Sequence, residues 1–388
     1  MKKPLLERAA VTYFQSRSQR VARPRLGDAV DAVHTLNTHE QAAIKRVERG
    51  AITRAAIAGA ISAAICAFAE LVADPYLPEG APLLSSARYW LILGGATLGA
   101  AVVEIAFLYW DTLRSMHQLA LVAGLELFTE GEESSVLVDG LARAALELPN
   151  PVEGPHGINP RREASKWRLV LASLAYKAKV GVTNFLVKML VRRLLGRVFV
   201  RSVVTTFIPF VAVPITALWN GIVSYLILRE GRIRAMGPSA ARAMVATIFD
   251  SAGEISQGGR LAARRAVGAA IVRTQDLHPN LVALLDEVTV RSGATPPGEG
   301  LDNVEGFLAS LPSLPQPELQ VVRQVLAVAC IIDGRFTAPE KRLWADVLLA
   351  SGARARVDFA PVEALRVAFA RGDPRLEGLL SAVREPAQ

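Results

Sequence analysis

Two long apolar runs in the first third of the chain constrain its fold more than any other feature. Residues 55–73 carry no charged side chain except Glu70, and residues 89–110 form a longer run that begins and ends with a Tyr-Trp pair. At about 1.5 Å per helical residue, each run is long enough to cross the hydrocarbon core of a bilayer. Aromatic side chains at both ends suit the membrane interface. The pattern predicts a transmembrane helical hairpin over residues 55–110.

The composition supports a membrane protein. The chain of 388 residues is 51% apolar, carries 44 Lys and Arg for a net charge of +8, and has a mean hydropathy of +0.30. Soluble proteins rarely combine these values, whereas membrane proteins do because their charges gather at the ends of spans. A hairpin buried in a soluble protein is the alternative. The abundance of Ala, Leu and Arg without alternating β-branched residues predicts an all-α fold.

The distribution of charge predicts an orientation. Eleven Lys and Arg precede the first run, while Arg88 is the only basic residue between the two runs. By the positive-inside rule both ends of the hairpin face the cytosol. The basic N-terminus lacks an apolar core and a cleavage site, so we expect no cleaved signal peptide. Cys66 and Cys330 are far apart in apolar contexts, which argues against a disulfide framework.

Two acids lie inside the apolar runs, and an acid at membrane depth is a functional candidate. Glu70 lies near the outer end of its run, and Glu104 lies about two turns from the inner end of the other. Because these depths differ, a shared proton site is hard to build, and we expect snorkelling or a hydrogen bond within a homo-oligomer. Small residues at four-residue spacing, such as Gly95 and Gly99, also favour close helix packing.

A strongly basic region follows a helical connector over 111–160 that ends in Pro and Gly. Residues 161–201 contain eleven Lys and Arg against one acid, with apolar side chains between them. Such a helix suits the surface of an anionic leaflet, so membrane lipids are the predicted partner. Nucleic acid is the alternative, but no stacking platform or groove-binding motif accompanies the charge.

A third apolar run covers residues 203–228 and has basic residues on both flanks. Pro209 and Pro214 interrupt it, and each removes a backbone donor. This symmetry predicts a re-entrant hairpin that returns to the cytosolic side. A kinked span is the alternative, and it would place everything after residue 230 outside.

This third run resembles the apolar segment of EcsC-like bacterial proteins. Pro209 and Asn220 match that segment, whereas Ala212 and Thr216 stand where those proteins usually have glycine. The resemblance implies a membrane-associated module without enzymatic activity.

The C-terminal residues 314–388 contain the clearest local motif, IIDGRFTAPEK. Gly334 follows an apolar helical pattern and can adopt the left-handed conformation that ends a helix. Thr337 and Glu340 are spaced for a capping box that opens the next helix. The Asp-Gly turn and the following Glu resemble the TerB-like (tellurite-resistance) domain. That resemblance implies a small helical bundle active in stress response, with Asp333 and Glu340 as candidate ligands for a divalent cation.

The residues of the turn leave its role open between shape and metal binding. An EF-hand of ordinary length is excluded because Arg335 stands at the third position of the loop. Three further acids are candidate ligands without a clear match in the TerB-like pattern: Asp346, Asp358 and Glu363. His278 precedes a proline, and we interpret it as part of a corner between two helices.

The chain has no phosphate-binding loop, zinc motif or nucleophile elbow, so we predict no catalytic residue and no resident cofactor. The expected function is a bacterial inner-membrane protein whose cytosolic C-terminal module binds a protein partner as an interaction or scaffold module. An oligomeric transporter or channel component that uses the intramembrane glutamates is the alternative. The predicted segments are 1–54, 55–110, 111–160, 161–235, 236–293, a linker over 294–313, and 314–388.

Overall fold

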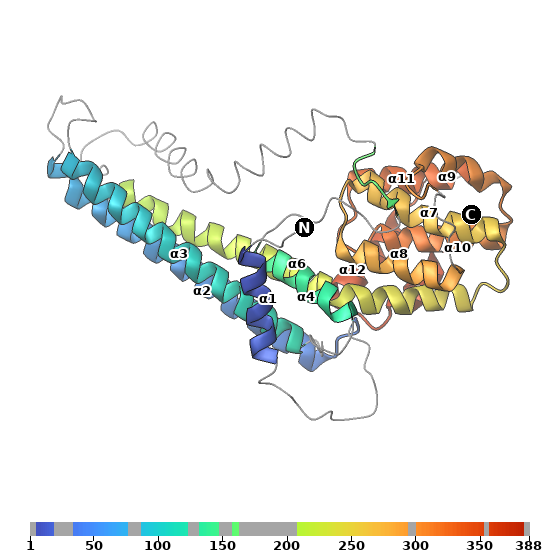
Figure 1. Cartoon of the computed structure of the whole chain (residues 1–388), viewed down its shortest axis with the longest axis horizontal. Helices are drawn as coiled ribbons and strands as arrows, with labels where there is room; N and C mark the ends of the chain where they lie inside the picture. The colour runs from blue at the N-terminus through green and yellow to red at the C-terminus, as the bar shows by residue number, and fades with distance from the viewer. Residues whose placement is uncertain are drawn as a thin grey trace. The chain divides into compact units, whose positions relative to one another are not determined.

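The computed structural model describes residues 5–18, 34–76, 87–122, 132–146, 157–162, 208–293, 300–352 and 357–383. In these ranges every regular element is a helix, which confirms the predicted all-α class (Figure 1). The longer helices are α1 (Leu5–Ser18), α2 (Thr38–Ala73), α3 (Ala87–Val122), α4 (Glu132–Ala145), α6 (Ile208–Asp250), α7 (Gln257–Thr274), α8 (Pro279–Ser292), α9 (Val304–Ser310), α10 (Gln316–Ala329), α11 (Ala338–Ala350), α12 (Ala360–Arg371) and α13 (Leu376–Ala382). Short 3₁₀ turns cover Asp74–Tyr76 and Leu311–Ser313.

The chain divides into two compact units. The membrane unit comprises residues 45–115 and 165–228, and the bundle unit comprises residues 1–44, 116–164 and 229–388. Helices α2, α3 and α6 each contribute residues to both units. The expected borders after residues 54, 110 and 235 fall inside helices α2, α3 and α6. Hydropathy changes along these helices, but a change of side chain does not interrupt the backbone hydrogen bonds.

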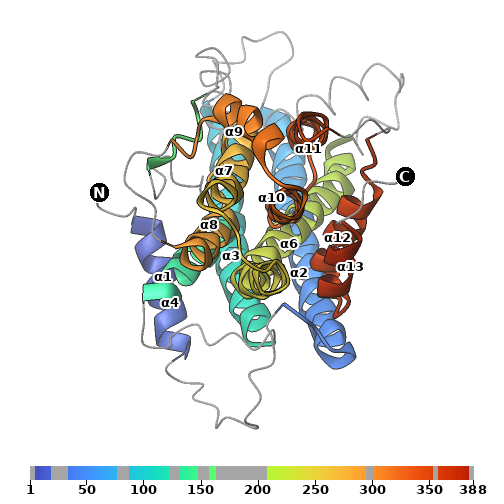
Figure 2. The ribbon, with the colours of Figure 1, turned by 90° about the vertical axis from the view of Figure 1, so that its right-hand side faces the viewer.

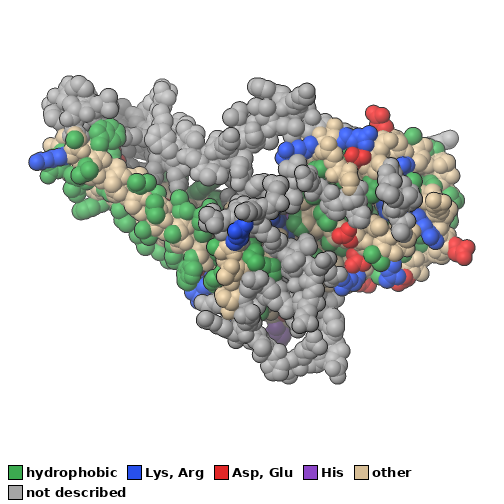
Figure 3. All heavy atoms as spheres, viewed as in Figure 1, with side chains coloured by type: hydrophobic (Ala, Val, Ile, Leu, Met, Phe, Trp, Pro, Cys, Tyr) green, Lys and Arg blue, Asp and Glu red, His purple; other side chains and the backbone are tan. Residues whose placement is uncertain are grey.

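The membrane unit is built from long apolar helices. Three helical stretches, Thr38–Tyr76, Ala87–Val122 and Ala212–Asp250, have the length and the apolar composition needed to cross a membrane. Many of their large apolar side chains are exposed, including Leu91 at 78% and Val103 at 69%. Figure 3 shows green apolar side chains along these helices, whereas charged side chains are scattered over the bundle unit. The two predicted apolar runs therefore lie in helices suited to lipid.

Helix α6 corrects the prediction for the third apolar run. Instead of a re-entrant hairpin within residues 203–228, one helix extends from Ile208 to Asp250. Pro209 lies in the first turn, where its missing N–H has no intrahelical partner to lose. Pro214 lies inside the helix, and such prolines are tolerated in spans because neighbouring groups satisfy the freed carbonyl. The predicted basic helix over 161–201 lies outside the described residues except for its first two.

Glycine allows α6 to approach α2 closely. A Cβ atom on Gly59 would lie 2.5 Å from Asn220 Nδ2 and 2.9 Å from the Thr216 carbonyl oxygen, and Gly221 faces Ile52 on the same helix α2. Since residue numbers rise along α6 as they fall along α2, these two helices are antiparallel. Close packing by small residues was predicted for both runs, but around Gly95 and Gly99 of α3 there is open space in the described structure.

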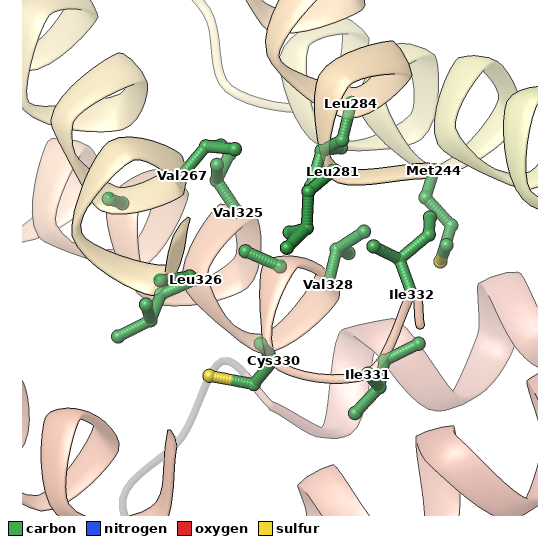
Figure 4. Packing of buried hydrophobic residues seen from close by; sticks show 14 of the residues in the cluster. Met244, Val267, Leu281, Leu284, Val325, Leu326, Val328, Cys330, Ile331 and Ile332 are labelled. Carbon is green, nitrogen blue, oxygen red and sulfur yellow. The ribbon is translucent and has the colours of Figure 1, made fainter. Parts of the chain in front are cut away.

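Helix α7 forms the centre of the bundle unit. It packs against α8, α9, α10 and α11, and its residues are buried on all sides, as expected for a helix enclosed by others. Gly268 is required because a Cβ atom there would lie 2.1 Å from the Leu301 carbonyl oxygen. Figure 2 shows these helices end-on, and Figure 4 shows Val267 packed near Val325, Leu326 and Leu281.

The C-terminal residues share this core and do not form a separate bundle. Buried apolar side chains of α10 to α13 belong to one cluster with those of α6 to α9. Within the expected linker 294–313, residues 304–310 form α9, with Val304 and Phe307 buried. This helix is short and has few apolar residues, so the sequence shows no clear helical periodicity there. The segment 314–388 is therefore part of a larger helical unit.

Candidate functional site

The Asp-Gly turn has the local geometry that the sequence predicts. Gly334 has φ of +76°, the left-handed conformation expected after α10. The Asp333 carboxylate accepts a hydrogen bond from the Arg335 amide at 2.8 Å. Such a bond to the backbone two residues on is typical of Asp in turns. Burial raises the pKa of Asp333.

Glu340 closes the predicted capping box at the start of α11. Its Oε2 accepts hydrogen bonds from the Thr337 amide at 2.5 Å and from the Thr337 hydroxyl at 2.7 Å. The side chain is fully buried, and its Oε1 has no hydrogen-bond partner among the described residues. Burial, together with the nearby charge of Asp333, raises the pKa of Glu340 to about 7. A buried carboxylate beside a second acid favours its protonated form.

The turn is held against helix α6. Arg229 Nη2 donates to the Gly334 carbonyl oxygen at 3.0 Å, and Arg366 Nη1 of α12 approaches the same oxygen at 3.4 Å. Gly334 also packs directly on Ile233, whose side chain would lie 2.9 Å from any Cβ atom there. The glycine therefore serves both the left-handed turn and the close contact with α6.

Asn280 joins α6 to the turn through its side-chain amide. Its Nδ2 donates to the Ile233 carbonyl oxygen at 2.9 Å and to the Ile332 carbonyl oxygen at 2.7 Å. The side chain is fully buried, and it presses so closely on Gly237 that no larger residue fits there. One amide thus satisfies two main-chain acceptors on separate elements, and this holds the turn in place.

His278 and Glu230 form a polar contact beside the turn. His278 is the N-cap of α8, and its Nδ1 accepts from the Asn280 amide at 3.2 Å. Its Nε2 lies 3.0 Å from Glu230 Oε1. Since Nδ1 accepts, the neutral ring carries its hydrogen on Nε2 and donates it to Glu230. Arg234 and Arg335 complete the set, with nitrogen atoms 2.9 and 3.6 Å from the Glu230 carboxylate.

The sequence predicted His278 at a corner between two helices, and the structure confirms that position. The sequence did not indicate which residue the imidazole ring would contact. Glu230 lies 48 residues earlier. Neither residue belongs to a recognisable motif, and no local spacing connects them. Arg229, Glu230 and Asn280 are therefore the site residues that the sequence did not indicate.

The acids considered as additional metal ligands do not gather at the turn. Asp346 pairs with Arg273 at 3.7 Å, Asp358 accepts from the Ala360 amide at 2.8 Å, and Glu363 pairs with Arg366 at 2.6 Å. Across the described ranges, no three His, Cys, Asp or Glu side chains come close enough to hold a metal ion. Metal binding by Asp333 and Glu340 stays a prediction.

The intramembrane acid Glu104 has a partner within its own chain. Its Oε1 accepts from Asn220 Nδ2 of α6 at 2.6 Å, and both side chains are buried. The expected hydrogen bond is therefore present, but a neighbouring helix of the same chain supplies it in place of another subunit. Two turns away, Arg54 of α2 pairs with the buried Asp111 of α3 at 2.7 Å.

Fold and contacts together define an all-helical protein with three helices able to span a membrane. No family model matches the chain, and neither the curated proteins nor the solved structures yield a significant match. The TerB-like and EcsC-like resemblances therefore stay predictions.

Proposed function

We propose that this chain is a membrane-anchored interaction protein of the bacterial cytoplasmic membrane, and that its C-terminal helices bind a protein partner in the cytosol without catalysing a reaction. The observation that carries this proposal is helix α6. It continues without a break from the apolar residues 208–228 into residues 229–250 of the bundle core. The Asp-Gly turn, the feature shared with the TerB-like domain, is fastened to its first turn after Leu228.

The direction of α6 supports a cytosolic position for the C-terminal helices. In the membrane unit α6 is antiparallel to α2, because Thr216 and Asn220 face Gly59 while Gly221 faces Ile52. Leu228 therefore lies toward the end of the unit where the apolar run of α2 begins. By the positive-inside rule, the eleven basic residues before that run favour the cytosol for this end, and not the outer position expected above for a kinked span.

The polar groups around the turn suit an anchoring role. Arg229 and Asn280 donate hydrogen bonds to main-chain carbonyls. The Glu230 carboxylate lies close to His278, Arg234 and Arg335. These contacts would hold the turn and the start of α8 against residues 229–234 of α6. A divalent cation at Asp333 and Glu340 would regulate the turn, in keeping with a role in stress response.

Reporter fusions test the topology. A cytosolic reporter placed after residue 388 should be active and a periplasmic reporter inactive, with the same result for fusions at the N-terminus. The chain should also stay in the membrane pellet after an alkaline carbonate wash. A periplasmic signal from the C-terminal fusion, or release by carbonate, would refute the proposal.

Calorimetric titration tests the regulatory cation. The full-length chain in detergent would be titrated with Ca²⁺, Mg²⁺ and Zn²⁺, with Asp333→Asn as the control. Binding heat that the control loses supports the regulation, and identical traces for the two proteins would remove it.

A second candidate function is transport by an oligomer that uses Glu104. The observation in its favour is that Asn220 contacts this acid and that the helices of the membrane unit bury further polar side chains: Ser62, Thr216 and Ser224. Intramembrane polar clusters often mark ion or proton pathways. Glu104→Gln should abolish proton or cation flux in vesicles if this function holds, and unchanged flux would leave the anchoring function.

A further inference from the structure

The exposed face of α2 changes character along its length. Its exposed side chains are charged or polar from Lys45 to Thr53, and then apolar from Ile57 onward. The exposed large apolar residues continue at helical spacing as Ile61, Ile65, Phe68 and Val72. Positions three or four apart share one helix face. A single face of α2 thus passes from a polar to an apolar environment between Thr53 and Ile57.

Helix α3 shows the same change at the same level. Arg54 Nε lies 2.7 Å from Asp111 Oδ1 and its Nη2 lies 3.1 Å from Ser115 Oγ, which fixes the register of the two helices. On the apolar side of this contact α3 exposes Ile105, Tyr109 and Trp110, and on the other side it exposes Arg114. Both helices therefore mark one membrane boundary.

At this boundary the acidic side chains are buried and the basic side chains are exposed. The acids Glu48 and Asp111 are buried, with 9% and 3% exposure. The bases Lys45, Arg46, Arg49 and Arg114 are exposed, and none of these four pairs with an acid of the described chain. The Arg114 guanidinium instead lies 5.5 Å above the centre of the Trp110 ring. Among the described residues of α2 and α3, the charges exposed at this level are therefore all positive.

An apolar groove lies farther along the same two helices. It lies between α2 and α3, has a volume of about 560 Å³, and is lined by Ile61, Ile65, Phe68 and Ile92 among others. On α2 its lining runs from Ile61 to Val72, and on α3 it consists of Ile92 and Ala96, which precede Trp110 by 18 and 14 residues. Next to the basic residues themselves, the apolar surface is the exposed face of α2 and α3 that begins at Ile57 and Trp110. A ligand that fits the charge and this face has an anionic head and an apolar tail.

We propose that Lys45, Arg46, Arg49 and Arg114 form a collar that binds the headgroups of anionic phospholipids, with their acyl chains against the exposed apolar faces of α2 and α3. The proposal rests on the membrane anchoring proposed above and adds a lipid preference to it. The Arg114–Trp110 pair is suited to this role because Arg keeps its charge in the headgroup layer while its stem and the indole remain in the interface. An acidic protein segment would match the charge but leave the exposed apolar faces of α2 and α3 uncovered.

Lipid retention in nanodiscs tests the collar. The full-length chain would be reconstituted in an equal mixture of phosphatidylglycerol and phosphatidylcholine, and the lipids that stay bound would be counted by native mass spectrometry. Wild type should retain phosphatidylglycerol preferentially. The variant R46Q/R49Q/R114Q should lose this preference by roughly fivefold per arginine. The matched control R260Q/R342Q/R371Q changes three exposed arginines of the bundle unit and should behave as wild type.

Two further results decide the proposal. Arg114→Lys keeps the charge and should retain most of the preference, so it serves if the triple variant fails to fold. Equal retention of the two lipids by wild type, or equal loss in the triple variant and its control, would overturn the collar. Membrane anchoring is judged separately, because release of wild type by carbonate would refute anchoring, whereas a retained chain without lipid preference would refute the collar alone.

Discussion

Helices α3 and α7 are both rich in Ala, Gly and branched apolar residues, yet they meet opposite surroundings. Leu91, Leu98 and Val103 of α3 are more than two-thirds exposed, whereas Val267 and Ile271 of α7 are fully buried. Helix α7 has 18 residues and carries four arginines, while α3 has 36 residues and an apolar stretch long enough to span a bilayer. A large apolar helix face must be shielded from water. Neighbouring helices shield α7, whereas the exposed face of α3 suits contact with lipid.

The two units also treat buried polar groups differently. In the bundle unit, several buried donors reach main-chain carbonyls of other elements, as in Arg264 to Gly293 and Asn280 to Ile332. In the membrane unit, Asn220 of α6 donates to the side chain of Glu104 on α3. In a helix within lipid, the backbone N–H and C=O groups bond to each other inside the helix. Hydrogen bonds between side chains can therefore fix the register of neighbouring helices.

The largest expected effect tests the different role of glycine in α7 and α3. Gly268→Leu should unfold the bundle unit or cost about 3 kcal/mol or more, because the new side chain meets the Leu301 carbonyl oxygen. Gly95→Leu should change little, since space around it is open. Thermal unfolding of the purified chain in detergent, followed by circular dichroism, measures both. Similar losses in the two variants would contradict the comparison.

The next effect concerns the amide that joins α6 to the turn. Asn280→Ala removes donors from the Ile233 and Ile332 carbonyls in a buried site and should cost about 2–4 kcal/mol. Asn303→Ala is the control, because it removes only the N-cap of α9 and should cost about 1 kcal/mol. Denaturant unfolding compares them. A smaller loss for Asn280 than for Asn303 would argue against the bridge.

The stability of the bundle unit should depend on pH through Glu340. Its pKa is raised from an ordinary value of 4.5 to about 7. The folded state therefore binds more protons than the unfolded state between these values, and stability should fall as pH rises through this range, by up to about 3 kcal/mol. Unfolding midpoints measured from pH 5 to 8 test this. Glu340→Gln should flatten the profile, and an unchanged slope in that variant would assign the effect to another group.

The smallest effect belongs to the membrane unit. Glu104→Ala removes the hydrogen bond from Asn220 and should cost about 1 kcal/mol, a typical value for bonds between membrane helices. Glu104→Gln can still accept that bond through its carbonyl oxygen and should be nearly neutral. Unfolding in mixed detergent micelles measures both variants. Equal losses would show that charge, and not the hydrogen bond, matters at this position.

Part of the site was predictable because its causes are local. The left-handed Gly334 and the capping box of Thr337 and Glu340 depend on residues within one turn of each other. The Glu230–His278 contact was not predictable, because its members are 48 residues apart and share no motif. The path of α6 was wrongly predicted because two prolines and the basic residues on both flanks suggested a hairpin, whereas one helix runs from Ile208 to Asp250.

The sequence by itself determined the all-helical class, the apolar helices and the shape of the Asp-Gly turn, because hydropathy and capping act between near neighbours. Only the tertiary structure decided that the turn is fastened to α6 and that α7 is the centre of the bundle. It also decided that Glu104 is bonded within its own chain. These outcomes depend on which distant surfaces fit together, and that fit is set by the packing of whole helices.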